Sequence, residues 1–210
     1  ITIGNLEKAY DNFIKASKLD PDNSITYYNI ASNLQIQNKH KEACEYFSKA
    51  YVIEPNDSYL AAMALSEVKI QDWDCAIKHY KILATHHPEK QAYQYNLATC
   101  YEEIGEYKYA IAILSKLVAM NPKSVSMGQK LAGLFLKTGQ PALAKEIYER
   151  LLLLGNVGFD VYYQFAHICL MLKDTDRAEK IFKKVIELKP DYAEAHKDLG
   201  VLYLSKRLFD

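Results

Sequence analysis

The chain has 210 residues, half of them hydrophobic, and its 26 Lys and Arg residues balance its 26 Asp and Glu residues. Nucleic-acid-binding proteins draw much of their affinity from a basic excess that releases counterions from phosphates, so this neutral balance argues against a nucleic-acid partner. The sequence also lacks a run of the roughly 18 apolar residues that a membrane span needs, so no membrane partner is expected.

The four cysteines are widely spaced, and the shortest gap is the 25 residues between Cys75 and Cys100. Zinc sites and the disulfide frameworks of small secreted domains use denser cysteine patterns. A reducing compartment therefore explains the cysteines most simply, and a cytoplasmic location is predicted. The sequence shows no phosphate-binding glycine loop and no nucleophile motif, so neither enzyme activity nor a cofactor is expected.

Prolines recur at a near-constant interval along the chain. The intervals are 34, 33, 34 and 68 residues, and Asn156 stands where the last interval would be halved. An alanine lies twelve residues before each of these six sites, and a bulky residue lies eight before it. The prolines are Pro21, Pro55, Pro88, Pro122 and Pro190; the alanines are Ala9, Ala43, Ala76, Ala110, Ala144 and Ala178; the bulky residues are Phe13, Phe47, Tyr80, Leu114, Tyr148 and Phe182. Such self-similarity at a fixed period is typical of a repeat architecture.

Each period predicts two amphipathic helices joined by a tight turn, with the proline ending the second helix. The frame predicts one array over residues 1–210 with about 12 helices. In chain order it contains a second helix alone in residues 1–23, complete pairs in 24–57, 58–90, 91–124, 125–158 and 159–192, and a first helix alone in 193–210. Because the frame starts and stops half-way through a unit, we expect a fragment of a longer array, whose exposed terminal helices would favour self-association.

The lettering resembles the tetratricopeptide repeat, in which about 34 residues carry W-x2-L-G-x2-Y, then A-x3-F, then P. The first-half slots are filled by Ile30-Ala31-Leu34, Leu97-Ala98-Tyr101, Leu131-Ala132-Phe135, Phe165-Ala166-Cys169 and Leu199-Gly200-Tyr203. The resemblance covers the whole chain and implies an all-α fold, a right-handed α-solenoid (superhelix) of stacked antiparallel helix pairs. The repeat near Ser58 is one residue short, and its slots fit best as Ala64-Leu65-Val68 if the deletion lies in the turn before Trp73.

Glycines mark two kinds of connection in this frame. Gly105 and Gly139 fall in the turn between two helices of a pair, where we expect a left-handed backbone residue to end the first helix. Gly155 and Gly158 replace the proline in the fifth pair and are both able to adopt positive φ. They are interpreted either as a hinge or as a plain loop.

In the tetratricopeptide repeat family the first helices line a concave groove that holds a peptide. The words YNIA at Tyr28 and YNLA at Tyr95 occupy the same slot two repeats apart, and Asn29 and Asn96 look like part of the family's asparagine ladder. An amide donates and accepts hydrogen bonds at once, and tyrosine adds flat contact area. The alternative is that these residues only connect adjacent helices. The predicted groove residues are Tyr28, Asn29, Ser32, Met63, Tyr95, Asn96, Thr99, Lys130, Tyr163, Gln164 and His167.

Two more specific site types are disfavoured. A chaperone-tail clamp needs several cations and amides; Lys130 and Asn96 fit, but Ser126, Ala62 and Ser66 occupy the other slots. A metal site among His79, His86 and His87 would need a nearby carboxylate or thiolate, and the sequence offers only Glu89. Histidines at the end of a helix are favoured there by the helix dipole alone.

The resemblance thus implies a non-catalytic protein–protein interaction scaffold whose groove binds a peptide or protein partner. The alternative is a regulatory or substrate-recruiting arm of a larger enzyme or assembly, with the active domain outside this sequence. An RNA-reading array of the pentatricopeptide type is disfavoured by the period and the neutral charge. Structural self-assembly of the repeats is a further hypothesis.

Overall fold

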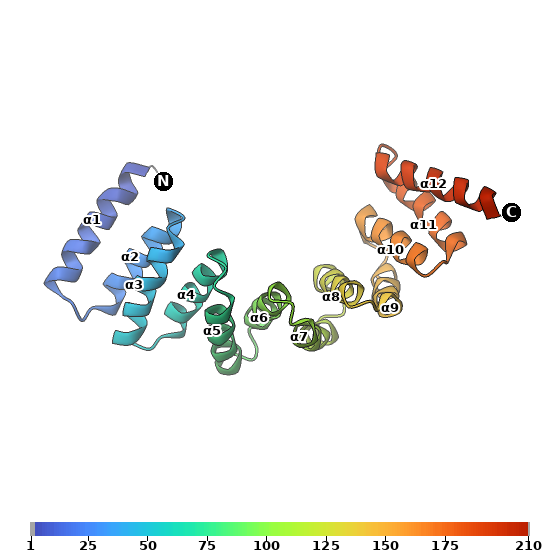
Figure 1. Cartoon of the computed structure of the whole chain (residues 1–210). Helices are drawn as coiled ribbons and strands as arrows, with labels where there is room; N and C mark the ends of the chain where they lie inside the picture. Colours follow the sequence, from blue (N-terminus) through green and yellow to red (C-terminus); the bar gives the residue numbers. More distant parts are fainter. Residues whose placement is uncertain (1–2, 210) are drawn as a thin grey trace. The chain divides into compact units, whose positions relative to one another are not determined.

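The computed structural model describes residues 3–209, and within that range it consists of helices and their connections (Figure 1). The prediction of an all-α fold with about twelve helices is confirmed for these residues. None of the helices described there has both the length and the apolar content to span a membrane. The helices are α1 (Ile3–Leu19), α2 (Ser24–Ile36), α3 (His40–Ile53), α4 (Asp57–Lys69), α5 (Trp73–His86), α6 (Gln91–Glu103), α7 (Tyr107–Met120), α8 (Val125–Lys137), α9 (Pro141–Leu152), α10 (Phe159–Met171), α11 (Thr175–Leu188) and α12 (Ala193–Phe209).

Consecutive helices pack on one another from α1 to α6 and from α8 to α12. We call α2, α4, α6, α8, α10 and α12 the first helices, and α1, α3, α5, α7, α9 and α11 the second helices. The chain forms two compact units, Ile1–Ala110 and Ile111–Asp210, so that the boundary falls inside α7. Each unit is a stack of helix pairs, as expected for an α-solenoid, and the two are described separately below.

Small residues let the paired helices approach closely. The alanines at the predicted small-residue slots of the first and second helices are fully buried: Ala31, Ala43, Ala76, Ala98, Ala110, Ala132, Ala144 and Ala178. Large side chains, Phe47, Phe165 and Phe182 among them, fill the space beside these contacts and are also fully buried. Each pair therefore carries one slice of a core that its neighbours complete.

The turns within the helix pairs share one backbone conformation. Each spans three residues, and its middle residue has positive φ: Asn38, Gln71, Gly105, Gly139 and Lys173. In each, the residue after this one donates its N–H to a carbonyl five positions back, as Lys39 does to Leu34 at 2.9 Å and Asp174 does to Cys169 at 2.8 Å. This is the Schellman motif, which satisfies the free carbonyls at a helix end. The prediction for Gly105 and Gly139 is confirmed, and three other turns adopt the same conformation without glycine.

Gln71 and Lys173 are the two of these five residues whose side chains are least suited to this backbone conformation. A residue other than Gly, Asn or Asp costs about 1–2 kcal/mol in the left-handed region. Replacing it by glycine removes this cost, but the greater conformational entropy of glycine in the unfolded chain offsets part of the gain in stability. We therefore expect Lys173→Gly to raise the free energy of unfolding by about 0.5–1 kcal/mol, as measured by urea denaturation. Lys173→Asn should give a smaller gain and Gly139→Lys a loss. Equal stability of all four proteins would contradict the argument.

The repeat that is one residue short has its deletion in a connection that the sequence did not indicate. The helix α4 begins 33 residues after α2, and its turn to α5 has the usual three residues, 70–72. The loop before α4, residues 54–56, is one residue shorter than the loops before α2, α6 and α8. Asn56 caps α4 by accepting a hydrogen bond from the N–H of Ser58 at 2.8 Å, which fixes this early start. The predicted deletion before Trp73 is therefore wrong, and the slots of α4 move by one residue.

The connection between α9 and α10 is the longest in the chain, residues 153–158. Gly155 has a φ of +76°, which a glycine adopts at no cost. Gly158 has a φ of −70° and is the N-cap of α10. Only the first of the two glycines takes the positive φ expected for both.

Candidate functional site

In the N-terminal unit the predicted groove residues on α2 are partly committed to packing. The ring of Tyr28 lies 5.6 Å from that of Phe47 and 5.0 Å from that of Tyr59, centroid to centroid. Asn29 and Ser32 are partly exposed on the same helix. The Tyr28 ring therefore joins α2 to α3 and α4 and leaves only part of its surface for a ligand.

On α6, Asn96 donates from Nδ2 to the hydroxyl of Tyr80 on α5 at 3.2 Å. Burial raises the pKa of Tyr80 to about 12, so the hydroxyl stays neutral and can accept this bond. One of the two N–H groups of the Asn96 amide is thus used within the fold. Thr99 donates to the carbonyl of Tyr95 at 3.0 Å along the same helix, and both side chains are partly exposed.

Met63 does not lie where the sequence predicted. The register of α4 puts Met63 in the slot that Ile30 and Leu97 fill in neighbouring repeats, and only 6% of Met63 is exposed. Its predicted place on the first-helix side is wrong, because the deletion precedes α4. Ala62 and Leu65 stand in the slots equivalent to Asn29 and Ser32.

The C-terminal unit brings three predicted residues, Lys130, Gln164 and His167, to one space. We call it the α8–α10 hollow; it measures about 560 Å³ and opens between two first helices. Its lining consists of Gln129, Lys130, Gly133, Leu136, Tyr148, Gln164, His167, Ile168 and Met171. The side-chain oxygen of Gln164 accepts a hydrogen bond from the hydroxyl of Tyr148 and lies 3.5 Å from Nε2 of Gln129.

Tyr163 and His167 share one carboxylate of α12. The hydroxyl of Tyr163 donates to Oδ2 of Asp198 at 2.7 Å, and Nε2 of His167 lies 3.1 Å from the same oxygen. Burial, followed by this hydrogen bond to Asp198, raises the pKa of Tyr163. The ring of Phe182 packs edge-on against both aromatic residues. Asp198 was not among the predicted groove residues, although it stands in the same slot of α12 as Gln164 in α10.

The histidines at the end of α5 have a carboxylate partner that sequence reasoning missed. His86 Nδ1 and His87 Nε2 each lie 2.9 Å from Oδ2 of Asp57, the first residue of α4. Partial burial pushes the pKa of Asp57 upward, but the hydrogen bonds from His86 and His87 outweigh it and hold that pKa below its usual value. Among the residues described, no three His, Cys, Asp or Glu side chains are arranged to hold a metal ion.

Comparison with known families agrees with this architecture. One model described as tetratricopeptide repeat matches residues 61–125, and another matches residues 25–57 and 159–192. Together the matches cover more than half of the chain. The chain belongs to the tetratricopeptide repeat family. The resemblance inferred from the proline and alanine spacing is thereby confirmed.

Two curated relatives are much longer than this chain. One is the human protein O-mannosyl-transferase TMTC3, 25% identical over 189 residues, which are 90% of this chain and 19% of that protein. The other is the BBSome complex member BBS4 homolog of Drosophila melanogaster, 22% identical over 220 residues, covering 98% of this chain and 45% of that protein. The chain thus spans less than half the length of either relative.

Solved structures share the tetratricopeptide repeat fold at low identity. YrrB, described as a tetratricopeptide repeat protein with an unusual peptide-binding site, superposes with a TM-score of 0.69 at 18% identity, covering 90% of this chain and 98% of that one. A chain of the Naa15/Naa10 complex bound to HypK-THB gives 0.73 at 16% identity over 96% of this chain and 32% of that one. A MamA structure gives 0.71 at 21% identity over 81% and 94%. At these identities the likeness is one of fold alone.

Proposed function

We propose that the first-helix side of this chain binds an extended segment of a protein partner and that the chain acts as a non-catalytic interaction scaffold. The tetratricopeptide repeat fold supports a protein-interaction role in general. The observation that carries the finer proposal is the α8–α10 hollow, where Lys130, Gln164 and His167 line one space between two first helices.

The lining of the α8–α10 hollow suits an extended peptide chemically. The N–H groups of Gln164 can donate and the side-chain oxygen of Gln129 can accept, so together the two amides can hold a peptide backbone without reading its sequence. Leu136, Ile168 and Met171 supply apolar contact for the side chains of the peptide. Methionine adapts its shape to different neighbours, which favours a range of ligands over a single one.

In the N-terminal unit the proposal extends to the partly exposed side chains of α2 and α6. These residues are Tyr28, Asn29, Ser32, Tyr95, Asn96 and Thr99. Asn29 and Asn96 stand in the slot that Gln164 occupies in α10, so each unit offers amides to a ligand from equivalent helices. Tyr163 contributes by holding Asp198, and through it His167, in place.

A second candidate function is that of a recruiting or regulatory arm of a larger enzyme or assembly. The specific observation in its favour is that the chain aligns with 19% of an O-mannosyl-transferase and 45% of a BBSome complex member. In that case the hollow would bind a substrate protein or another subunit. We place either function in the cytoplasm, and the four free thiols support a reducing compartment.

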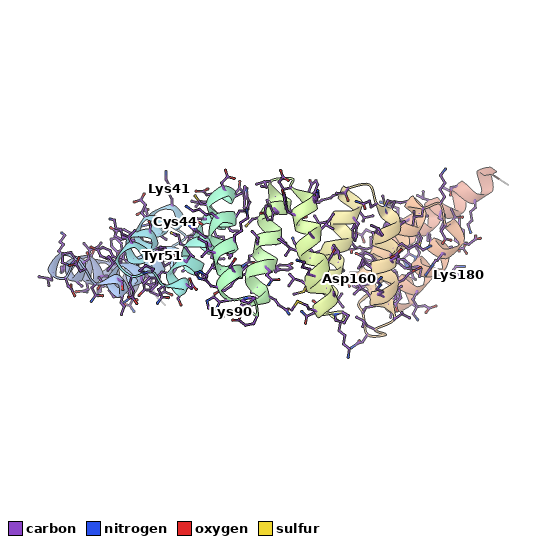
Figure 2. The ribbon with its side chains drawn as sticks, turned by 90° about the horizontal axis from the view of Figure 1, so that it is seen from below. Lys41, Cys44, Tyr51, Lys90, Asp160 and Lys180 are labelled. Atoms are coloured by element: carbon purple, nitrogen blue, oxygen red, sulfur yellow. The ribbon has the colours of Figure 1, made fainter. Side chains whose placement is uncertain are left out.

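Affinity capture with matched variants tests the scaffold. The baits are the natural chain, the variant Lys130→Ala with Gln164→Ala, and Lys180→Ala on the second helix α11 (Figure 2). We expect proteins captured by the natural chain and by Lys180→Ala to fall about tenfold with the double variant, as judged by quantitative mass spectrometry.

Unchanged helicity and thermal unfolding of the double variant would show that its loss is local. Equal capture by all three baits would contradict a site in the α8–α10 hollow. A variant carrying Asn29→Ala and Asn96→Ala then tests the N-terminal unit in the same assay.

A further inference from the structure

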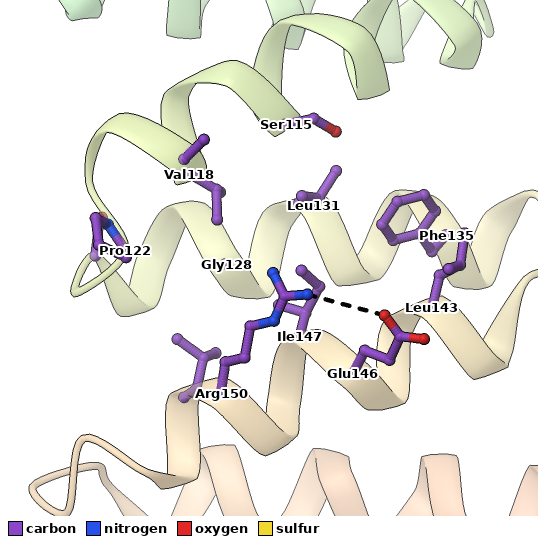
Figure 3. Close-up of a pocket in the computed structure, with 13 residues that line it drawn as sticks. Ser115, Val118, Pro122, Gly128, Leu131, Phe135, Leu143, Glu146, Ile147 and Arg150 are labelled. Atoms are coloured by element: carbon purple, nitrogen blue, oxygen red, sulfur yellow. Dashed lines mark ion pairs between the residues drawn. The ribbon is translucent and has the colours of Figure 1, made fainter.

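A second hollow lies in the C-terminal unit and is lined by residues of α7, α8 and α9 (Figure 3). We call it the α7–α9 hollow; it measures about 310 Å³. Its lining is mainly apolar: Val118, Ala119, Pro122, Gly128, Leu131, Phe135, Leu143, Ile147 and Leu151, with Ser115, Ser124, Glu146 and Arg150 completing it. This volume is at the lower end of small-molecule sites and suits one or two apolar side chains of a ligand.

The α7–α9 hollow and the α8–α10 hollow lie on opposite sides of α8. Residues 128, 131 and 135 of α8 line the first, and residues 129, 133 and 136 line the second. Residue 130 also lines the second hollow, and with 3.6 residues per turn the mean directions of the two sets then differ by roughly 150°. A ligand in the α7–α9 hollow would therefore bind from the second-helix side and leave the proposed peptide site open.

One wall of the α7–α9 hollow contains a slot of α8 that has no side chain and against which Leu151 packs closely. The fourth residue of the first helix is Tyr27 in α2, Leu60 in α4, Gln94 in α6 and Tyr162 in α10, but it is Gly128 in α8. A Cβ atom at Gly128 would lie 3.0 Å from Cδ2 of Leu151. Glycine inside a helix costs about 1 kcal/mol relative to alanine, so this position lowers helix stability where the hollow forms.

The part of the chain around the α7–α9 hollow is basic although the whole chain is neutral. Residues 111–158 carry six Lys and Arg residues and two Glu residues, a net charge of +4. Of the two carboxylates, Glu149 forms an ion pair with Arg177 at 2.7 Å. Glu146 lies 3.9 Å from Arg150, and both of these side chains are exposed. Exposed pairs at such a distance contribute little, so Arg150 is available to a stronger anionic partner.

Cations stand directly at the rim. Arg150 lines the α7–α9 hollow, and its side chain extends away from the α9 ribbon (Figure 3). Lys123 lies between Pro122 and Ser124, which both line the hollow, and its side chain is exposed. An apolar hollow with a basic rim is complementary to an apolar side chain flanked by carboxylates.

We propose that the α7–α9 hollow binds an acidic peptide segment by inserting one large apolar side chain between α7, α8 and α9. Flanking Asp or Glu residues of the peptide meet Arg150 and Lys123 at the rim. This is a second interaction site, separate from the one proposed on the first-helix side.

Fluorescence anisotropy with three sets of labelled seven-residue peptides tests the proposal. The first set carries a central Leu, Phe or Trp flanked by Glu and Asp, the second has Ala at the centre, and the third has Lys flanks around the same central residues. We expect the first set to bind and the other two to bind at least about tenfold more weakly. Gly128→Leu adds to the wall of the hollow a side chain that must displace Leu151 into the space of the ligand, and it should abolish the difference between Leu and Ala at the centre.

Charge variants provide an independent arm of the experiment. Arg150→Glu with Lys123→Glu should weaken the acidic peptides about tenfold or more, while a single charge reversal on α11, Lys180→Glu, should leave their binding unchanged. Asn96→Ala, in the proposed groove, should leave this binding intact and so separates the two sites. Binding by none of the acidic peptides, or equal binding by the natural chain and Gly128→Leu, would overturn the proposal.

Discussion

Replacing Glu67 and His79 together, by Glu67→Leu with His79→Ile, is expected to leave the chain at least as stable as the natural protein. His79→Ile alone is expected to lower the free energy of unfolding by about 3–5 kcal/mol, because a carboxylate would remain buried without its partner. Replacing both members of a buried ion pair by apolar residues is often neutral or stabilises by about 1–4 kcal/mol. The single variant should therefore be less stable than the natural protein, whereas the double variant should not.

The reason lies in the slots these residues occupy. Glu67 stands on α4 where other first helices carry Leu34, Tyr101, Phe135 and Cys169. His79 stands on α5 where other second helices carry Tyr46, Ile113, Ile147 and Ile181. The side chains of Glu67 and His79 are 6% and 15% exposed, and Oε2 and Nδ1 lie 2.9 Å apart. One repeat has therefore exchanged an apolar pair in its core for a polar one.

A double-mutant cycle by urea denaturation at neutral pH measures this effect. The two single variants, Glu67→Leu and His79→Ile, and the combined variant are compared with the natural chain. Glu67→Leu should cost less than His79→Ile, because an imidazole can be buried as an uncharged group whereas a carboxylate left without its partner stays charged. Additive losses in the combined variant would contradict the explanation.

Phe182→Ala is expected to lower the free energy of unfolding by about 3–5 kcal/mol and to weaken binding at the first-helix side at the same time. Phe182 is fully buried on α11, and its ring lies 6.0 Å from that of Tyr163 and 5.5 Å from that of His167. The cavity left by the substitution would release both side chains from the positions in which Asp198 holds them.

Urea denaturation measures the change in the free energy of unfolding, and the NMR signals of the His167 ring show whether the ring becomes less ordered. Phe182→Leu fills most of the cavity and should cost about 1–2 kcal/mol while largely preserving the ring position. If Phe182→Ala left the His167 signals and partner capture unchanged, the support of the proposed site by α11 would be wrong.

The positions of the helices follow from local chemistry and could be predicted from sequence. The spacing of prolines and alanines indicates where helices end and where they touch, and Gly105 and Gly139 indicate the left-handed turns. The register of α4 could not be predicted in this way, because the proline interval does not tell in which connection a residue is missing. The helix start is set by Asn56, whose capping hydrogen bond depends on the backbone conformation of the loop.

The candidate sites depend on contacts between repeats, and the sequence indicates these less well. Asp57 and the histidines His86 and His87 meet because α4 starts beside the end of α5, although they are 29 and 30 residues apart. Gly128 is recognised as unusual only when its slot is compared among the repeats and its close packing against Leu151 is known. In both cases the sequence shows a residue type that is unusual for its slot. The residue that it contacts, however, is determined by the packing of the helices.

The three-residue turns within pairs suggest where this chain tolerates a change of length. Every such turn, from 37–39 to 172–174, has the same number of residues, whereas the connections between pairs have three, four or six. In each turn the carbonyl that accepts the closing N–H belongs to a core slot, such as Phe135 for Gln140. An insertion there would displace a core residue, while an insertion between pairs only lengthens a surface segment. Tags, cleavage sites or grafted loops therefore belong after Leu152, where the chain already carries two residues more than at most other junctions.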